Sequence, residues 1–197
     1  GIKNNAEDFL LNLPTISIDF DFSNFGYFKD LRLNEKTSVV GLKLDVTKMI
    51  STALSLFPAT STIYFVGGTT SFDKFMMSIA LNSLQSIGKN TKIITITDIS
   101  MDMILKRVMK LPDNSIVFIP SFNTDSKLVP YRNTEAIRLI SASANAPVFS
   151  YSDIGLGEGS IGGYLLSFKN VGLISGANAI KILKGEDPNS LKITERD

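Results

Sequence analysis

The sequence of 197 residues contains no histidine, no cysteine and no tryptophan. Without histidine and cysteine it cannot form a Ser-His-Asp triad, a Cys-His nucleophile, a zinc finger or a disulfide framework. No side chain has an ordinary pKa near neutrality, so acid–base chemistry would depend on carboxylates, lysine and tyrosine. These absences favour a binding protein over an enzyme, and we expect no metal and no cofactor.

A strong net charge and long apolar runs are also lacking. The 20 Lys and Arg residues nearly balance 19 Asp and Glu residues, which argues against nucleic acid as a partner, because phosphate binding needs clustered cations. Every apolar run is shorter than the about 18 residues that a membrane-spanning helix requires. The chain opens with Gly1 rather than Met, which predicts a piece processed or excised from a longer protein.

Short β-branched runs alternate with longer amphipathic segments along the chain. Four near-continuous apolar runs predict strands of a parallel sheet covered on both faces: 62–66, 92–97, 115–120 and 147–151. Helices are expected between these strands, the first over 72–87 with Ser71 as its N-cap. Right-handed crossovers then give an open, doubly wound α/β sheet.

The segments on either side of this sheet supply fewer elements. Strands are expected there over residues 15–19, 38–44 and 164–168. Helices are expected over residues 46–57 and 171–184. Asp45 precedes the first of these helices as its N-cap. We predict a partial, discontinuous first lobe from residues 1–60 and 155–197, and a complete second lobe from residues 61–154.

Two glycine-rich segments follow expected strands. Gly157-x-Gly159-x-x-Gly162 matches the dinucleotide-binding pattern, which works only between a strand and the N-terminus of a helix. A strand-like run follows these glycines instead, so a flexible crossover is the favoured interpretation and a cofactor site the alternative. The segment 67–71 (GGTTS) leaves backbone amides open to an anion or polar ligand, or forms only a tight turn.

Polar and aromatic side chains follow the other expected strands of the central sheet. Ser121–Asp125 offers Ser, Asn, Thr and Asp side chains, with Phe122 able to stack on a flat ligand, unless the segment is an ordinary polar loop. Tyr151 and Asp153 follow the last strand. Ligands of open α/β sheets bind outside the carboxyl ends of the strands, so we expect these loops and Gly67–Ser71 to meet at one edge.

Charged groups offer further alternatives. Arg132 can hold a ligand carboxylate or pair with Glu135 on the surface, which is the commoner arrangement. Asp19, Asp21 and Asp153 would be the carboxylates of an acid–base pair, but their spacing does not require one.

A family pattern extends over residues 114–188. The segments that carry it are Ser121-Phe122, Ala146-Pro147-Val148, Leu156-Gly157-x-Gly159, Gly162-Gly163-x-Leu165-Leu166-Ser167-Phe168 and Ile182-Leu183-Lys184-Gly185-Glu186-x-Pro188. In these segments the sequence resembles the periplasmic-binding-protein-like (type 1) sensor domain of bacterial membrane histidine kinases. It is also similar to the tryptophan/tyrosine-type substrate-binding proteins of ABC transporters.

The resemblance implies a two-lobed clamp with crossovers at the hinge and a ligand cleft between the lobes. Family members begin with further βα units, so the first lobe is expected to be incomplete in this sequence. Seven positions are carried over as ligand-binding residues: Asp19, Gly68, Ser121, Phe122, Asp125, Tyr151 and Asp153. The expected ligand is a small polar or aromatic molecule.

The expected function is that of an extracytoplasmic sensor domain on the periplasmic or extracellular face of the cytoplasmic membrane, with membrane-anchored signalling domains as partners. A soluble or lipid-anchored substrate-binding protein of an ABC importer is the alternative. Two further interpretations are an α/β enzyme that binds a nucleotide at Gly157–Gly162, and the effector domain of a transcription regulator. The lack of recognisable DNA-binding helices disfavours the last of these.

Overall fold

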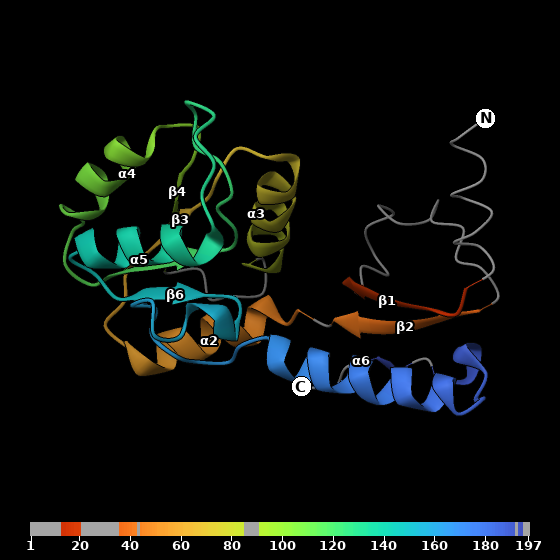
Figure 1. The fold of residues 1–197 in the computed structure, drawn as a ribbon. Coiled ribbons are helices and arrows are strands. Elements are labelled where there is room, and N and C mark those ends of the chain that lie inside the picture. Colours follow the sequence, from red (N-terminus) through yellow and green to blue (C-terminus); the bar gives the residue numbers. More distant parts are fainter. Residues whose placement is uncertain (1–12, 21–35, 43, 85–90, 192, 195–197) are drawn as a thin grey trace. The chain divides into compact units, whose positions relative to one another are not determined.

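The computed structural model describes residues 13–20, 36–42, 44–84, 91–191 and 193–194, and strands alternate with helices along the chain (Figure 1). The chain divides into two compact units. Unit 1 contains residues 1–44 and 166–197, and unit 2 contains residues 45–165. The described strands pair in parallel in both units, which confirms the expected α/β class with parallel sheets.

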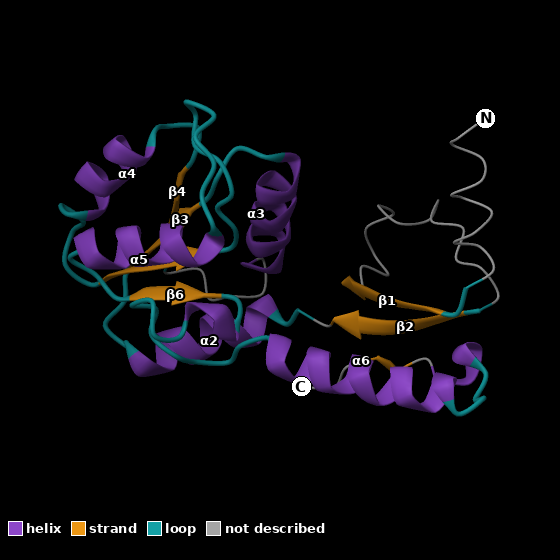
Figure 2. Ribbon diagram, in the orientation of Figure 1, coloured by secondary structure: helices purple, strands orange, loops and turns teal. Residues whose placement is uncertain are grey.

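Unit 2 contains a four-stranded sheet in the order β4-β3-β5-β6 (Figure 2). Its strands are β3 (Thr62–Val66), β4 (Lys92–Ile96), β5 (Ser115–Ile119) and β6 (Val148–Ser150). Its helices are α2 (Val46–Leu56), α3 (Ser71–Ser83), α4 (Met101–Val108) and α5 (Asn133–Ser143), followed by the short 3-10 helix η2 (Asp153–Gly155). The four predicted strands of this sheet are therefore confirmed, each to within one residue at either end.

The apolar runs explain why this sheet is covered on both faces. Every residue of β3 and β5 is buried, whereas the edge strand β4 is partly exposed. One face packs with the buried sides of α4 and α5. On the other face, Phe65 and Phe118 lie with ring centroids 5.5 Å apart, and Phe57 at the end of α2 contacts Phe149. Alternating side-chain directions along each strand thus build two apolar layers.

Side-chain caps fix the first residues of two helices. Asp45 accepts a 2.9 Å hydrogen bond from Lys48 N and caps α2, as predicted. The prediction that Ser71 caps α3 is wrong, because Thr70 occupies that position. Asp73 N donates to the Thr70 hydroxyl over 3.0 Å, and Thr70 N donates to the Asp73 carboxylate over 3.1 Å. This reciprocal capping box satisfies two backbone amides at once.

Unit 1 contains a three-stranded sheet within the described residues, in the order β1-β2-β7. Its elements are β1 (Thr15–Phe20), β2 (Thr37–Leu42), α6 (Phe168–Leu183), the short 3-10 helix η3 (Pro188–Leu191) and β7 (Ile193–Thr194). α6 contacts both β1 and β2. The buried Asn178 of α6 donates to Ser38 Oγ in β2 over 3.4 Å and to Leu191 O over 3.3 Å, so one side chain links three elements.

The prediction of a strand over 164–168 is wrong. α6 begins at Phe168, because the Ser167 hydroxyl accepts a 3.3 Å hydrogen bond from Asn170 N and caps the helix. The third strand of this sheet is β7 instead, which pairs with β2 and was not predicted.

The division of the chain differs from the boundaries predicted after residues 60 and 154. α2 belongs to unit 2, where it contacts α3. The chain after η2 also stays in unit 2, since Ile161 N donates to Val148 O of β6 over 2.7 Å. The predicted continuation of α3 to residue 87 falls outside the described residues. In the described part of the chain, no helix combines the length and hydropathy needed to cross a bilayer.

Candidate functional site

The carboxyl ends of β3 and β5 lie where the chain connections of the unit 2 sheet change direction. β3 leads through α3 to β4 on one side, and β5 leads through α5 to β6 on the other. Crevices at such switch points are the usual ligand sites of open parallel sheets. The loops that follow β3 and β5 are therefore the candidate site in unit 2.

These two loops are hydrogen-bonded to each other. Gly68 N donates to Ser121 O over 3.1 Å, and Thr69 N donates to Thr124 O over 2.8 Å. The Thr69 hydroxyl lies 3.1 Å from Asp125 O and donates to it. The prediction that the polar segments meet at one edge of the sheet is confirmed for Gly67–Ser71 and Ser121–Asp125. For Tyr151 and Asp153 it stays a prediction.

A buried carboxylate outside the predicted site residues holds both loops. Asp73 in the first turn of α3 is 0% exposed. It accepts hydrogen bonds from the Ser121 hydroxyl at 2.6 Å, the Asn123 side-chain amide at 2.7 Å and the Thr70 hydroxyl at 2.7 Å. The backbone amides of Thr70 and Asn123 donate to it as well. These donors offset the cost of burying a charge. The spacing Thr70-x-x-Asp73 is a capping-box signal that could have identified it.

Gly68 lies so close to this network that no side chain fits. A Cβ atom at this position would lie 2.8 Å from Thr124 O and would also collide with the Asp73 carboxylate. The missing side chain is what lets the two loops approach. In the described structure Gly68 therefore acts on loop packing, and its backbone amide is already used.

Ser121 and Phe122 are both fully buried. The Ser121 hydroxyl is directed to Asp73. The Phe122 ring packs edge-on against Tyr131 with centroids 5.7 Å apart, inside the core shared with α4 and α5. The expectation that Phe122 stacks on a flat ligand does not hold in this structure, because burial in the core leaves its ring no accessible face.

Asp125 is 2% exposed and organises the end of its own loop. Its carboxylate accepts hydrogen bonds from Met101 N at 3.0 Å, Lys127 N at 2.8 Å and Val129 N at 3.1 Å. It thereby caps α4, whereas Ser100 makes no side-chain cap. Burial acts to raise the pKa of Asp125, but the three amides and the Lys127 charge outweigh it, so the pKa lies below the ordinary 3.8.

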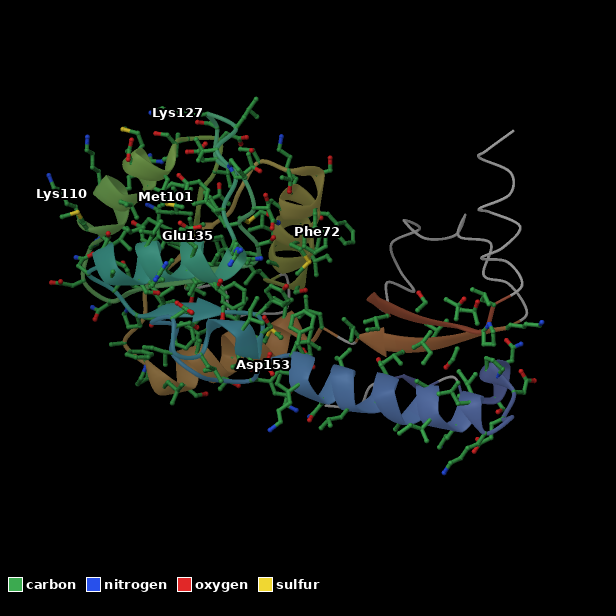
Figure 3. All side chains as sticks on the ribbon, in the orientation of Figure 1. Phe72, Met101, Lys110, Lys127, Glu135 and Asp153 are labelled. Atoms are coloured by element: carbon green, nitrogen blue, oxygen red, sulfur yellow. The ribbon has the colours of Figure 1, made fainter. Side chains whose placement is uncertain are left out.

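Tyr151 directly follows β6 and is 6% exposed. Burial raises the pKa of its hydroxyl above the ordinary 10.0, with a hydrogen bond to Ser152 acting in the opposite direction. Asp153 begins η2 and is partly exposed on the flank of unit 2 (Figure 3). Asp19 belongs to β1 of unit 1, opposite Gly41, and its side chain lies outside the described part of the chain.

The segment Gly157–Gly162 runs beside β6 and α5. Gly157 and Gly159 have φ values of 83° and 95°, which favour glycine. A Cβ on Gly159 would lie 2.7 Å from Ser141 Cβ of α5, so this glycine also permits a close approach. The 3-10 helix η2 separates β6 from these glycines, and α6 begins only at Phe168. The dinucleotide pattern therefore lacks the directly following helix N-terminus on which it depends. Its geometry fits the crossover interpretation.

The charged alternatives gain no geometric support. Arg132 precedes α5 and is exposed, and it forms no ion pair with Glu135 within the described ranges. Asp153 is in unit 2, whereas Asp19 is in unit 1 and Asp21 lies outside the described residues. No group of three or more acidic residues that could hold a metal occurs in the part of the chain that the structure describes.

Close to the hydrogen bonds that join the two loops, the accessible side chains include short polar groups and the ring of Phe72. Phe72 at the start of α3 is 41% exposed and is directed outward in Figure 3. Thr69, Thr70, Asn123 and Thr124 are partly exposed. The Thr69 hydroxyl and the Asn123 amide nitrogen donate within the loops, which leaves oxygen lone pairs of Thr69 and Asn123 as acceptors for a ligand. This surface can therefore accept hydrogen bonds and stack on a flat group.

Comparison with known proteins adds a likeness of fold. No protein-family model matches the sequence, and no curated protein matches it significantly. The crystal structure of a conserved domain protein from Vibrio cholerae O1 biovar El Tor str. N16961 is similar, with a TM-score of 0.57 and 16% sequence identity. The match covers 82% of this chain and 53% of that one, so this chain spans about half the length of that protein. At this identity the similarity concerns the α/β fold alone.

Proposed function

We propose that this chain is an extracytoplasmic sensor domain of a histidine-kinase type signalling protein, and that it binds a small polar or aromatic molecule. The observation that carries this proposal is the pair of joined loops at the switch point of the unit 2 sheet, with Phe72, Thr69 and Asn123 at their surface. The insertion of unit 2 within a discontinuous unit 1 supports a two-lobed, type 1 periplasmic-binding-protein-like architecture. The resemblance of residues 114–188 supports the sensor assignment.

The chemistry of the loops narrows the ligand class. Acceptor oxygens of Thr69 and Asn123 favour a ligand that carries N–H or O–H donors. The exposed ring of Phe72 favours a flat or aromatic group. Because Asp73 fixes both loops without a ligand, binding loses little conformational entropy. The proposed ligand is therefore a small aromatic or heterocyclic molecule with amine or hydroxyl donors.

Signalling in this proposal depends on closure of the two units. A ligand shifts the population of a closed state only as far as its affinity for that state exceeds its affinity for the open one. In this proposal, the ligand bound at the unit 2 loops would supply this difference. The resulting displacement would pass to the membrane-anchored signalling domains.

A ligand screen tests the proposal. Thermal-shift measurements across amino acids, aromatic amines and heterocycles should give a saturable increase of Tm for one group of ligands, and small-angle scattering should then show compaction. Phe72→Ala should weaken binding about two- to tenfold, since an aromatic contact contributes about 0.5–1.5 kcal/mol. Leu56→Ala is the matched control, because Leu56 is 54% exposed at the end of α2. Equal effects of both variants, or no stabilising ligand in the screen, would contradict the proposal.

The second candidate is a soluble or lipid-anchored substrate-binding protein of an ABC importer. It uses the same fold and the same ligand edge, and the similarity of residues 114–188 to that class favours it equally. The sequence adjoining these 197 residues distinguishes the two. A lipid-attachment cysteine before them indicates import, and a membrane span after them indicates sensing.

A further inference from the structure

The outward side of α4 is basic. Its inward side is formed by three buried apolar residues, whereas Lys106, Arg107 and the following Lys110 are exposed. Lys106 and Arg107 are consecutive residues of the last turn of α4, and Lys110 follows in the turn directly after the helix, so the three cations lie close together in the chain. Lys74 and Arg138 each have a carboxylate within 4 Å, but the three α4 cations have no ion-pair partner in the described part of the chain.

Apolar side chains accompany these cations. Met103 is 51% exposed and Met109 is 56% exposed. Met103 precedes Lys106 by three positions and Arg107 by four, and Met109 follows Lys106 by three, so both methionines border the cations. Methionine is flexible and adapts to irregular apolar surroundings.

The loop beside the start of α4 adds an exposed apolar tip. Leu128 is 79% exposed and Val129 is 42% exposed. Lys127 Nζ lies 3.7 Å from Asp102 Oδ2 of α4, which places this tip against the first turn of the helix. Figure 3 shows Lys127 and Lys110 near the two ends of the surface that α4 forms.

The structure holds this tip in a fixed conformation. Leu128 N donates to Asp125 O over 3.0 Å, while the Asp125 carboxylate accepts the amides of Lys127 and Val129. Leu128 has a φ of 61°, a left-handed conformation that glycine adopts freely and leucine only at a cost. A rigid loop that displays a leucine in solvent is preorganised to bury that side chain elsewhere.

We propose that these residues form a docking surface for an anionic lipid membrane, which we call the α4 face: Met103, Lys106, Arg107, Met109, Lys110, Lys127, Leu128 and Val129. Charge complementarity favours an anionic membrane as the partner, since clustered Lys and Arg attract anionic headgroups. The bordering Met and Leu side chains enter the boundary between headgroups and acyl chains. The α4 face belongs to unit 2 alone. Its tip, Lys127–Val129, is part of the loop that follows β5, but it does not include Thr69, Phe72 or Asn123, the residues proposed to contact the ligand.

Vesicle sedimentation of the full chain tests the proposal. Vesicles with about 30% phosphatidylglycerol in phosphatidylcholine should bind the chain, more weakly at high salt, and pure phosphatidylcholine vesicles should not. Lys106→Glu with Lys110→Glu should lower partitioning about 30-fold or more, at about 1 kcal/mol per cation. Met103→Ser with Leu128→Ser should lower it about tenfold. Circular dichroism and Tm verify that each variant folds. If the glutamate substitutions prevent folding, Lys106→Gln with Lys110→Gln removes both charges without reversing them.

Matched controls come from α6. Lys181→Glu with Lys184→Glu reverses two exposed lysines, and Ile180→Ser with Leu183→Ser alters side chains that are 55% and 86% exposed. Both control pairs should partition like the unaltered chain. Equal losses in the controls, binding to pure phosphatidylcholine, displacement by soluble glycerophosphate or absence of vesicle binding would each overturn the proposal.

Discussion

The Ser121 hydroxyl donates a 2.6 Å hydrogen bond to the carboxylate of Asp73, 48 residues earlier in the chain. This bond joins the first turn of α3 to the loop after β5, which are the two sides of the switch point. Both groups are 0% exposed, so water cannot replace either partner. Hydrogen bonds to charged groups are roughly twice as strong as neutral ones. The ligand edge of unit 2 is therefore held by an internal network.

We expect Ser121→Ala to lower the free energy of unfolding by about 2 kcal/mol, because it leaves a buried charged acceptor with one donor fewer. Asp73→Ala should cost more, since several buried donors lose their acceptor. Urea denaturation measures both. Ser78→Ala is the control: its hydroxyl donates to Phe75 O on the exposed side of α3, and it should change stability by less than about 0.5 kcal/mol.

The extra donors make the Asp73 network cooperative. Asn123 Nδ2 lies 2.7 Å from Asp73 Oδ1 and 3.0 Å from Ser121 Oγ, so the three side chains touch one another. Substitutions in such a network should not add. A double-mutant cycle of Ser121→Ala and Asn123→Ala should give a coupling energy of about 1 kcal/mol. Strict additivity would show that Asp73 bonds each partner independently.

Gly68→Ala should destabilise unit 2, because the added methyl group meets Thr124 O at 2.8 Å and the Asp73 carboxylate. Overpacking of this kind costs about 1–3 kcal/mol. Gly172→Ala provides the opposite expectation. A Cβ at Gly172 has no neighbour within 4 Å, and alanine favours a helix interior by about 1 kcal/mol. Tm should fall for Gly68→Ala and rise for Gly172→Ala. A rise for both would show that the two loops can move apart to accommodate the added methyl group.

The central sheet could be predicted because a strand that is covered on both faces is a nearly continuous apolar run in the sequence. β3 and β5 are apolar at every inner position, and their ends matched the sequence within one residue. The strand predicted over 164–168 was wrong because this segment is mostly apolar, as β3 and β5 are, but it leads into α6, which Ser167 caps. β7 has only two residues, too few to show any period.

The site was harder to predict because its polar residues bond one another. Sequence position placed Ser121 and Asp125 correctly at the carboxyl edge of the sheet. Their direction and burial depend on partners that are distant in the chain, Asp73 for Ser121 and Met101 for Asp125. Spacing does not encode such partners. A polar residue after a strand is thus compatible with both ligand binding and loop support.

Asp125 should make stability depend on acid pH. Its folded-state pKa lies below the ordinary 3.8, so the ionised form contributes stability above the unfolded pKa. That stability is lost as pH falls from near 4 through the folded value. Asp125→Asn should remove this part of the acid dependence and lower stability at pH 7. Denaturation at pH 7 and pH 3 measures the free energy of unfolding of the unaltered chain and of Asp125→Asn. If the difference between the two pH values were the same in both proteins, the expectation would be contradicted.

Leu128→Gly should stabilise the chain, although it removes a whole side chain. Leu128 has a φ of 61°, and a left-handed conformation costs an L-residue about 1–2 kcal/mol. Glycine has no such cost, and its greater freedom in the unfolded state offsets only about 0.5–1 kcal/mol of the gain. Leu156→Gly is the matched control, because Leu156 is 51% exposed with a φ of −69° and should lose stability. Urea denaturation of both variants should therefore give changes of opposite sign. A loss in both would mean that Leu128 already gains stability from packing in the free chain, which its 79% exposure argues against.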